Sequence, residues 1–310
     1  MKILKCAAAA LAVAFASVPA VAGTTLTPNL KASAFITETG DKSSFNWSVD
    51  LSPLLTFNST TGAIGVVDKT YNGVNLNNDS GGWAWKTQNI INPGDGKIIA
   101  TKEGWRWNSW DHQDGTKNTI ENAGNPWRST FMLDAVGGNV DPIMTYGFSA
   151  KNNTAFTQTY TFAIGEAIVP TISGAYTVYA DIAGSLTNGV AGSNVQITPV
   201  NAKLQTLRLS TDNGTTFVNA GVDVGIAATN GTAKGSYTYG PFAANNSGSG
   251  SYNYWEIETK FKLSGGNDVA TMSGYAEITP VPEPENFALF LAGLGLIGAI
   301  VRRRDSHVRR

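Results

Sequence analysis

A twelve-residue stretch, GWRWNSWDHQDG, holds the side chains of this chain that are best suited to chemistry. Its aromatic and acidic members, within residues 104–115, are Trp105, Trp107, Trp110, Asp111 and Asp114. Sugars stack their C–H faces on aromatic rings, and carboxylates accept hydrogen bonds from sugar hydroxyl groups. The stretch is therefore a candidate lectin-like contact site for a glycan.

Two other interpretations of the same stretch stay open. Trp105 and Trp107 alternate as on one face of a strand, and buried aromatic rings often fill the core of a β protein. Alternatively, the stretch could belong to a carbohydrate-active enzyme, because glycoside hydrolysis needs two carboxylates across the scissile bond. The acids available for such a pair are Asp111, Asp114, Glu103 and Glu121.

Oxygen-rich turns in this region also suit calcium, which prefers carboxylate and carbonyl ligands. Two such turns are NPGDG at residues 92–96 and DHQDG at residues 111–115. Neither has the ligand spacing of an EF-hand loop, and Asp-Gly sequences are common in ordinary turns. Calcium is thus an alternative, and the main expectation is a protein without a cofactor.

Other common catalytic chemistries lack their residues. The chain has one Cys and two His, and His112 is the single His before the C-terminal tail. A zinc site needs three or four His, Cys or carboxylate ligands, so zinc is not expected. The chain also lacks the Gly-x-Ser-x-Gly motif that marks many Ser-His-Asp hydrolases. The sequence therefore favours a protein without enzymatic activity.

The long middle part of the chain predicts an all-β fold. Gly, Asn, Ser and Thr punctuate it about every 8 to 12 residues, and β-branched and aromatic residues fill the intervals. The clearest strand, YWEIETKFKL at residues 254–263, alternates apolar and charged residues, which indicates one buried and one solvated face. We expect an antiparallel β-sandwich, with a jelly-roll-like arrangement as one form of it.

Further strands and turns are expected elsewhere in this body. They are strands at residues 45–51, 97–101, 157–164, 176–183 and 204–210, a turn at 152–154 and a hairpin turn at Asp212-Asn213-Gly214. Seven of the eight Trp precede residue 140, among many Asn, Asp and Gly, so loops are expected to dominate there. One domain over residues 23–280, or two packed subdomains that divide near residue 140, fits this pattern.

The first 22 residues have the pattern of a secretory signal peptide. Lys2 and Lys5 flank the start of a short apolar run, and Ala20 and Ala22 form a small-x-small exit. This order predicts a short signal helix, export through the Sec machinery and cleavage by signal peptidase after Ala22. Cys6 would leave with the signal, so the mature body would contain no disulfide.

The net charge of the exported body differs from that of the whole chain. The chain has 22 basic and 23 acidic residues, of which seven basic and three acidic residues lie in the signal or in residues 281–310. The body keeps 15 basic and 20 acidic residues, a net charge of −5. A mildly acidic body gives no reason to expect binding to nucleic acid.

The C-terminal segment, residues 281–310, contains three parts in order. Pro282-Glu283-Pro284 comes first, an apolar span at residues 287–301 follows, and a basic tail at residues 302–310 begins with Arg302, Arg303 and Arg304. Fifteen helical residues rise about 22 Å, against a hydrocarbon core of about 30 Å, so the span is short for a permanent anchor. The arginines predict a cytoplasmic tail and a body on the outer side.

This three-part arrangement resembles the PEP-CTERM sorting signal. The resemblance implies a Gram-negative bacterium and an exosortase, an integral-membrane processing enzyme that recognises the triplet. It also implies an association with exopolysaccharide, biofilm and the cell surface. Three segments of the body, YGFSAKNNTAFTQTYTFAI, YGPFAA and LSGGNDVATMSGYAEI, resemble passengers of such signals, and this second resemblance implies no reaction.

Together these features predict an exported protein that is anchored transiently and then reaches the cell surface or the extracellular matrix. The leading hypothesis is a secreted, non-enzymatic structural or adhesive protein among extracellular polysaccharide. The alternative is a carbohydrate-active enzyme or a lectin-like module that uses residues 104–115.

Overall fold

The structure, a computed structural model, describes residues 29–39, 44–67, 81–91, 98–109, 129–281 and 291–297. Within these ranges the chain is mostly β-strand, and all the strand pairs are antiparallel parts of one connected fifteen-stranded sheet. The all-β class predicted from the sequence is confirmed. The division of residues 23–280 into one or two domains stays a prediction.

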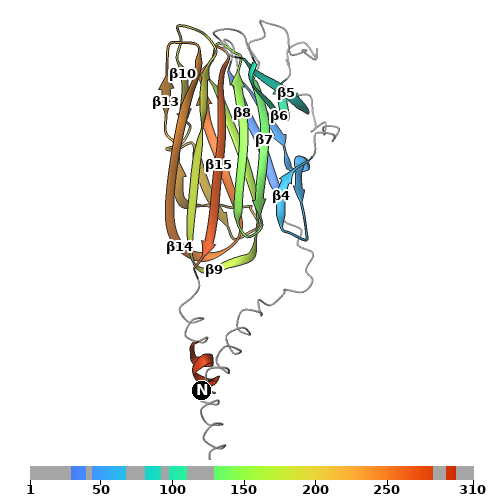
Figure 1. Cartoon of the computed structure of the whole chain (residues 1–310), viewed down its shortest axis with the longest axis vertical. Coiled ribbons are helices and arrows are strands. Elements are labelled where there is room, and N and C mark those ends of the chain that lie inside the picture. The colour runs from blue at the N-terminus through green and yellow to red at the C-terminus, as the bar shows by residue number, and fades with distance from the viewer. Residues whose placement is uncertain are drawn as a thin grey trace, which may run out of the picture.

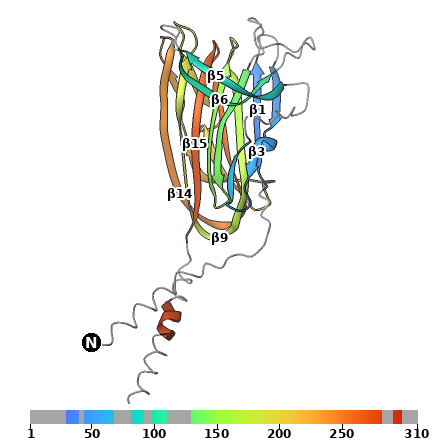
Figure 2. The same cartoon turned by 45° about the vertical axis from the view of Figure 1, so that its right-hand side comes forward.

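Two very long strands, β9 (Gln158–Asn188) and β14 (Gly235–Leu263), connect two layers of the fold. They pair with each other along nearly their whole length, and this register shifts between Tyr252 and Tyr254. On one side of this point β9 also pairs with β1, and on the other side it pairs with β15. Each long strand therefore contributes one half to each layer, as Figures 1 and 2 show.

The first layer is built around residues 158–168 of β9 and 254–263 of β14. Its other strands are β1 (Lys31–Thr39), β2 (Ser44–Asp50), β10 (Val195–Pro199), β11 (Gln205–Ser210), β12 (Val218–Val224) and β13 (Ala228–Asn230). The sheet order across this layer is β2, β1, β9, β14, β11 and β12; β10 also pairs with β14, and β13 pairs with β10.

The second layer is built around residues 172–188 of β9 and 235–252 of β14. Its other strands are β15 (Asp268–Pro280), β8 (Ile143–Asn152) and β7 (Ser129–Asn139). At β7 the sheet continues into two further pairs, β4 (Ala63–Val66) with β3 (Leu55–Phe57), and β6 (Ile98–Ser109) with β5 (Gly81–Ile91). A single 3-10 turn, η1 (Ser52–Leu54), precedes β3.

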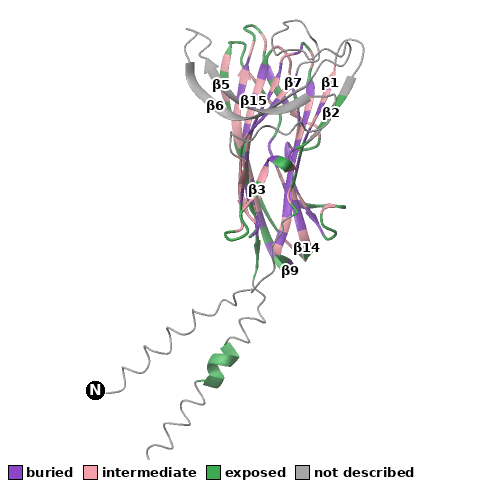
Figure 3. Ribbon diagram, turned by 90° about the vertical axis from the view of Figure 1, so that its right-hand side faces the viewer, coloured by how far each residue is buried: buried purple, intermediate pink, exposed green. Residues whose placement is uncertain are grey.

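Aromatic rings from both layers meet in the core. Phe148 of β8 packs on Phe162 of β9 and Phe261 of β14, with ring centroids 5.4 and 6.0 Å apart. Tyr146 reaches across the same space, and its hydroxyl donates a hydrogen bond to Gln205 Oε1 at 2.6 Å. Buried residues therefore lie on strands of both layers (Figure 3), and the ring contacts between the layers are those of a β-sandwich core.

The predicted hairpin turn after β11 is confirmed. Asn213 and Gly214 have φ angles of 58° and 78°, the left-handed region that these two residue types tolerate. The Ser210 hydroxyl donates to Asp212 Oδ1 at 2.6 Å, and the backbone N–H of Thr216 donates to the same oxygen at 2.8 Å. These bonds hold the pKa of the Asp212 carboxyl well below its usual range.

The strand predicted at residues 254–263 is confirmed as the last part of β14, with its apolar residues buried. The strands predicted at residues 157–164 and 176–183 are instead parts of one strand, β9. Pro170 and Gly174 lie between them and favour a break, but β9 keeps its pairing with β14 on both sides of this point.

In the region before residue 140, where loops are expected to dominate, residues 40–43, 68–80, 92–97 and 110–128 lie outside the described ranges. The strands predicted there at residues 45–51 and 97–101 correspond to β2 and to the start of the longer β6. The described part of this region also holds β5 and most of β7, so it is mainly strand.

Candidate functional site

The structure places two of the predicted glycan contacts on β6. Trp105 and Trp107 lie opposite Trp85 and Trp83 of β5, and on the other side Trp107 lies opposite the buried Phe131 of β7. This register brings four tryptophan positions into two neighbouring cross-strand pairs. The strand predicted at residues 97–101 is shorter than β6, and the strand placement of Trp105 and Trp107 was one of the open interpretations; their pairing with β5 was not predicted.

The other predicted contacts, Trp110, Asp111 and Asp114, lie outside the described residues, as do Glu121, His112 and the turn at residues 92–96. Glu103 lies on β6 opposite Thr87. Across the described ranges, no group of three or more His, Cys, Asp or Glu side chains could hold a metal ion. The lectin-like, catalytic and calcium interpretations of residues 104–115 therefore stay predictions.

The residues of the predicted export and sorting signals also lie largely outside the described ranges. These are Ala20, Ala22, Pro282, Glu283, Pro284, Arg302, Arg303 and Arg304. Within the predicted span, residues 291–297 are helical, and Leu291 and Leu296 are about two-thirds exposed, at 65% and 66%. Among the described residues, no helix has the length and apolar character needed to cross a bilayer.

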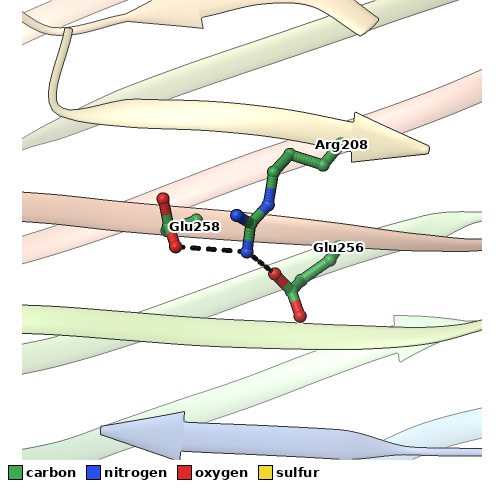
Figure 4. Close-up of polar contacts among 3 residues, drawn as sticks. All are labelled: Arg208, Glu256 and Glu258. Atoms are coloured by element: carbon green, nitrogen blue, oxygen red, sulfur yellow. Dashed lines mark hydrogen bonds and ion pairs between the residues drawn. The ribbon is translucent and has the colours of Figure 1, made fainter. Parts of the chain in front are cut away.

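The outer side of the first layer carries a cluster of opposite charges, which we call the charged face: Arg208, Glu256 and Glu258. Arg208 of β11 lies opposite Glu256 of β14, and its guanidinium donates to the Glu256 carboxylate. The same Nη2 atom lies 3.1 Å from Glu258 Oε2 (Figure 4). Burial raises the pKa of the Glu256 carboxyl, and Arg208 opposes this shift. The single positive charge of Arg208 therefore offsets one of the two negative charges of this face.

Next to the charged face lies an open depression of about 480 Å³ between β1, β2 and β9. Lys31, Asp50 and Glu256 supply charges around it, and Ser33 and Ser48 supply hydroxyl groups. The Ser52 hydroxyl, also in the lining, already accepts a hydrogen bond from the Ala32 backbone N–H at 3.0 Å. The depression is thus a small site on the first layer that charged and hydroxyl-bearing residues border.

A carboxyl group lies inside the first layer, behind this surface. Glu166 of β9 is fully buried, and its Oε1 accepts a hydrogen bond from the Trp255 indole N–H at 3.1 Å. Burial raises the pKa of the Glu166 carboxyl to about 9, so the group is neutral at physiological pH. Because no part of it reaches solvent, Glu166 is a structural group and not a candidate acid for a bound substrate.

The outer side of the second layer carries a different arrangement, which we call the tyrosine face: Tyr179, Asp181, Tyr275, Glu277 and Asn245. The two tyrosine rings lie 5.9 Å apart between centroids, with an interplanar angle of 59°. The Tyr179 hydroxyl donates to Asp181 Oδ2 at 3.1 Å, and the Tyr275 hydroxyl donates to the Glu277 carboxylate. Sequence reasoning missed this face.

A signal for the tyrosine face is nevertheless present in the sequence. YADI at residues 179–182 and YAEI at residues 275–278 are two copies of one pattern. β9 and β15 pair antiparallel so that Tyr179 lies opposite Glu277 and Tyr275 lies opposite Asp181. The repeat is visible in the sequence, but only the strand register shows that its two copies are adjacent.

The comparison with protein families gives a match at the C-terminal end. The family model described as the PEP-CTERM protein-sorting motif matches residues 280–304. This chain carries a PEP-CTERM sorting motif. The motif begins at Pro280, the last residue of β15, and therefore follows the β body directly. A PEP-CTERM motif indicates export, membrane-associated sorting and processing by an exosortase, as the sequence predicted.

The β body itself has no informative relative in these comparisons. None of the curated protein sequences matches the chain. Among solved structures, the infectious bursal disease virus VP2 subviral particle aligns with 12% identity over 87% of this chain and 84% of that chain, at a TM-score of 0.13. This likeness carries no argument about the fold or function of the PEP-CTERM protein.

Proposed function

We propose that this PEP-CTERM protein is a non-enzymatic structural or adhesive component of the extracellular polysaccharide matrix at the cell surface. Its single strongest support is the position of the sorting motif. The motif begins at the last residue of β15, so the sorting machinery handles the β body as its cargo. Export of a large all-β body with open polar faces suits a protein that contacts material outside the cell.

A sorting experiment in the native host tests this proposal. The wild-type chain is compared with a Pro282→Ala/Glu283→Ala/Pro284→Ala variant, in cells with and without the exosortase. We expect the wild-type chain in the washed polysaccharide fraction, and the variant in the membrane fraction. Wild-type chain that stays in the membrane fraction, or equal biofilm mass with and without the gene, would contradict a matrix role.

The non-enzymatic part of the proposal needs a separate assay. The purified chain is incubated with the isolated matrix polysaccharide, and the release of reducing ends is measured. We expect no release above that of a heat-inactivated sample. Release that disappears in an Asp111→Asn variant would instead support the alternative, a carbohydrate-active enzyme that uses residues 104–115.

A further inference from the structure

The tyrosine face combines aromatic rings with hydrogen-bonding groups in an arrangement that is built by two separate strands. The Tyr-Ala-acid pattern occurs once on β9 and once on β15, and the antiparallel register centres both copies on the pair Ala180 and Ala276. The face therefore has approximate local two-fold symmetry. Two rings and two carboxylates alternate across it, although their positions in the sequence are far apart.

The rings are held in place before any ligand arrives. Each tyrosine hydroxyl bonds to the carboxylate two residues further along its own strand, which keeps the ring lying along the strand. The bond to Asp181 raises the pKa of the Tyr179 hydroxyl. For Tyr275, burial is the main cause and the bond to Glu277 the second, and together they raise the pKa of the hydroxyl to about 12. Tyrosine offers rigid, amphipathic contact area at a low cost in conformational entropy.

A depression of about 570 Å³ adjoins the rings and supplies further polar groups. Its lining includes Tyr179, Asn245, Ser247, Thr177 and Glu277. The exposed Asn245 lies opposite Tyr179 on β14, and among the described residues its amide makes no hydrogen bond, whereas the amide of the next residue, Asn246, donates to the Ala220 carbonyl. One oxygen of each carboxylate, Asp181 Oδ1 and Glu277 Oε1, also has no such partner there.

From this geometry we propose that the tyrosine face binds a chain of uncharged sugars. Sugar rings present C–H faces to the tyrosine rings, and their hydroxyl groups donate to the two carboxylates and accept from the Asn245 amide. The face holds two acids, and its depression is lined by no Lys, Arg or His. An acidic polysaccharide would meet like charges there. This inference deepens the proposed matrix role and rests on it.

The charged face is the weaker candidate for the same ligand. Its acids, Glu256 and Glu258, are already bonded to Arg208, and its small depression contains no aromatic ring. Phe35 of β1 is a partly exposed aromatic residue on that side of the first layer, opposite Thr161 of β9. Phe35→Ala therefore serves as a control, because it removes an aromatic ring from the face that is not proposed to bind the sugar.

Affinity electrophoresis of the full-length chain tests the inference directly. Native gels contain dextran, β-1,3-glucan, hydroxyethyl cellulose or galactomannan as neutral probes, or alginate as an acidic probe. The detergent that keeps the tail soluble must have no sugar head group. We expect at least one neutral probe to retard the wild-type chain, and alginate to have no effect.

The variants are Tyr179→Ala/Tyr275→Ala, Tyr179→Phe/Tyr275→Phe and Phe35→Ala. The double Ala variant should bind the neutral probe at least about tenfold more weakly, since loss of a central aromatic contact commonly has this size. The double Phe variant keeps both rings and should retain most of the binding, and Phe35→Ala should bind as the wild type does. Far-UV circular dichroism and the unfolding midpoint confirm that each variant is folded.

Three results would overturn the inference: no neutral probe retards the wild type, alginate retards it instead, or the double Ala variant binds normally. The sorting experiment separates this failure from a failure of the matrix role. A double Ala variant that still reaches the polysaccharide fraction and supports normal biofilm mass would leave the matrix role intact and reject the tyrosine face as its glycan site.

Discussion

The two parts of β9 differ in where they place their polar groups. In residues 158–168, which belong to the first layer, Gln158 and Glu166 are fully buried inside the sandwich. In residues 172–188, which belong to the second layer, most inward positions are apolar, as Val178 and Ile182 illustrate. There the tyrosine face carries its polar groups on the outside.

This difference separates structural polar groups from accessible ones along a single strand. In the first layer, Glu166 is buried, and Glu256 and Glu258 are paired with Arg208. In the second layer, Asp181 and Glu277 lie on a partly exposed surface next to two rings. Changes in the first layer should therefore alter stability, and changes in the tyrosine face should alter binding.

The largest expected effect on stability is at Trp255, which is fully buried beside Glu166. Trp255→Ala should lower the free energy of unfolding by about 3–5 kcal/mol, because a large cavity forms and the Glu166 carboxyl loses its donor. Urea unfolding of the full-length chain, followed by circular dichroism, measures this change. Tyr275→Ala on the tyrosine face is the matched control, with an expected loss of about 1 kcal/mol or less. Equal losses at the two positions would remove the distinction between the layers.

The second effect concerns the pH dependence of stability. The folded-state pKa of Glu166 is about 9, well above the value of about 4.3 for an unfolded chain. Between these values the folded state holds a proton that the unfolded state releases, so stability falls as the pH rises. The slope is at most about 1.4 kcal/mol for each pH unit.

Glu166→Gln should remove this contribution, because the amide stays neutral at every pH. The variant and the wild type should unfold at similar urea concentrations near pH 5. By pH 7 the variant should be more stable by about 2–3 kcal/mol. Parallel profiles for Glu166→Gln and the wild type would show that the buried carboxyl does not control this dependence.

How far the sequence predicts the fold depends on the range over which each pattern acts. The alternation at residues 254–263 and the Asn213-Gly214 turn are local patterns, and both correspond to observed structure. The continuity of β9 is not local, since Pro170 and Gly174 favour a break that pairing with β14 overrides. The sorting motif is contiguous in sequence and was therefore predictable as a whole.

The candidate site was harder to predict for the same physical reason. The tyrosine face joins Tyr179 to Tyr275 through the register of β9 and β15, and nothing near either residue in the sequence encodes that register. Residues 104–115 were predicted as a candidate site because their aromatic rings and acids are close together in the sequence. Of these, the structure describes the strand positions of Trp105 and Trp107, which pair with β5 and β7.

The smallest expected effect is on the charged face. Arg208→Gln removes the cation between Glu256 and Glu258, and these two carboxylates on the same side of β14 then repel each other. Ion pairs at partly exposed sites contribute only about 0.2–1 kcal/mol, so the loss in unfolding free energy should stay within about 1 kcal/mol at low salt. The loss should shrink in 0.5 M NaCl, because this salt concentration screens charges beyond roughly 3–10 Å. Adding Glu258→Gln to Arg208→Gln should recover part of the loss, because only one carboxylate remains. A double-mutant cycle with Arg208→Gln, Glu258→Gln and the double variant measures this coupling.

A loss of several kcal/mol that salt does not change would instead place Arg208 in a structural role comparable to that of Trp255. Neutral sugar binding should be unaffected by Arg208→Gln, because the charged face and the tyrosine face lie on different layers.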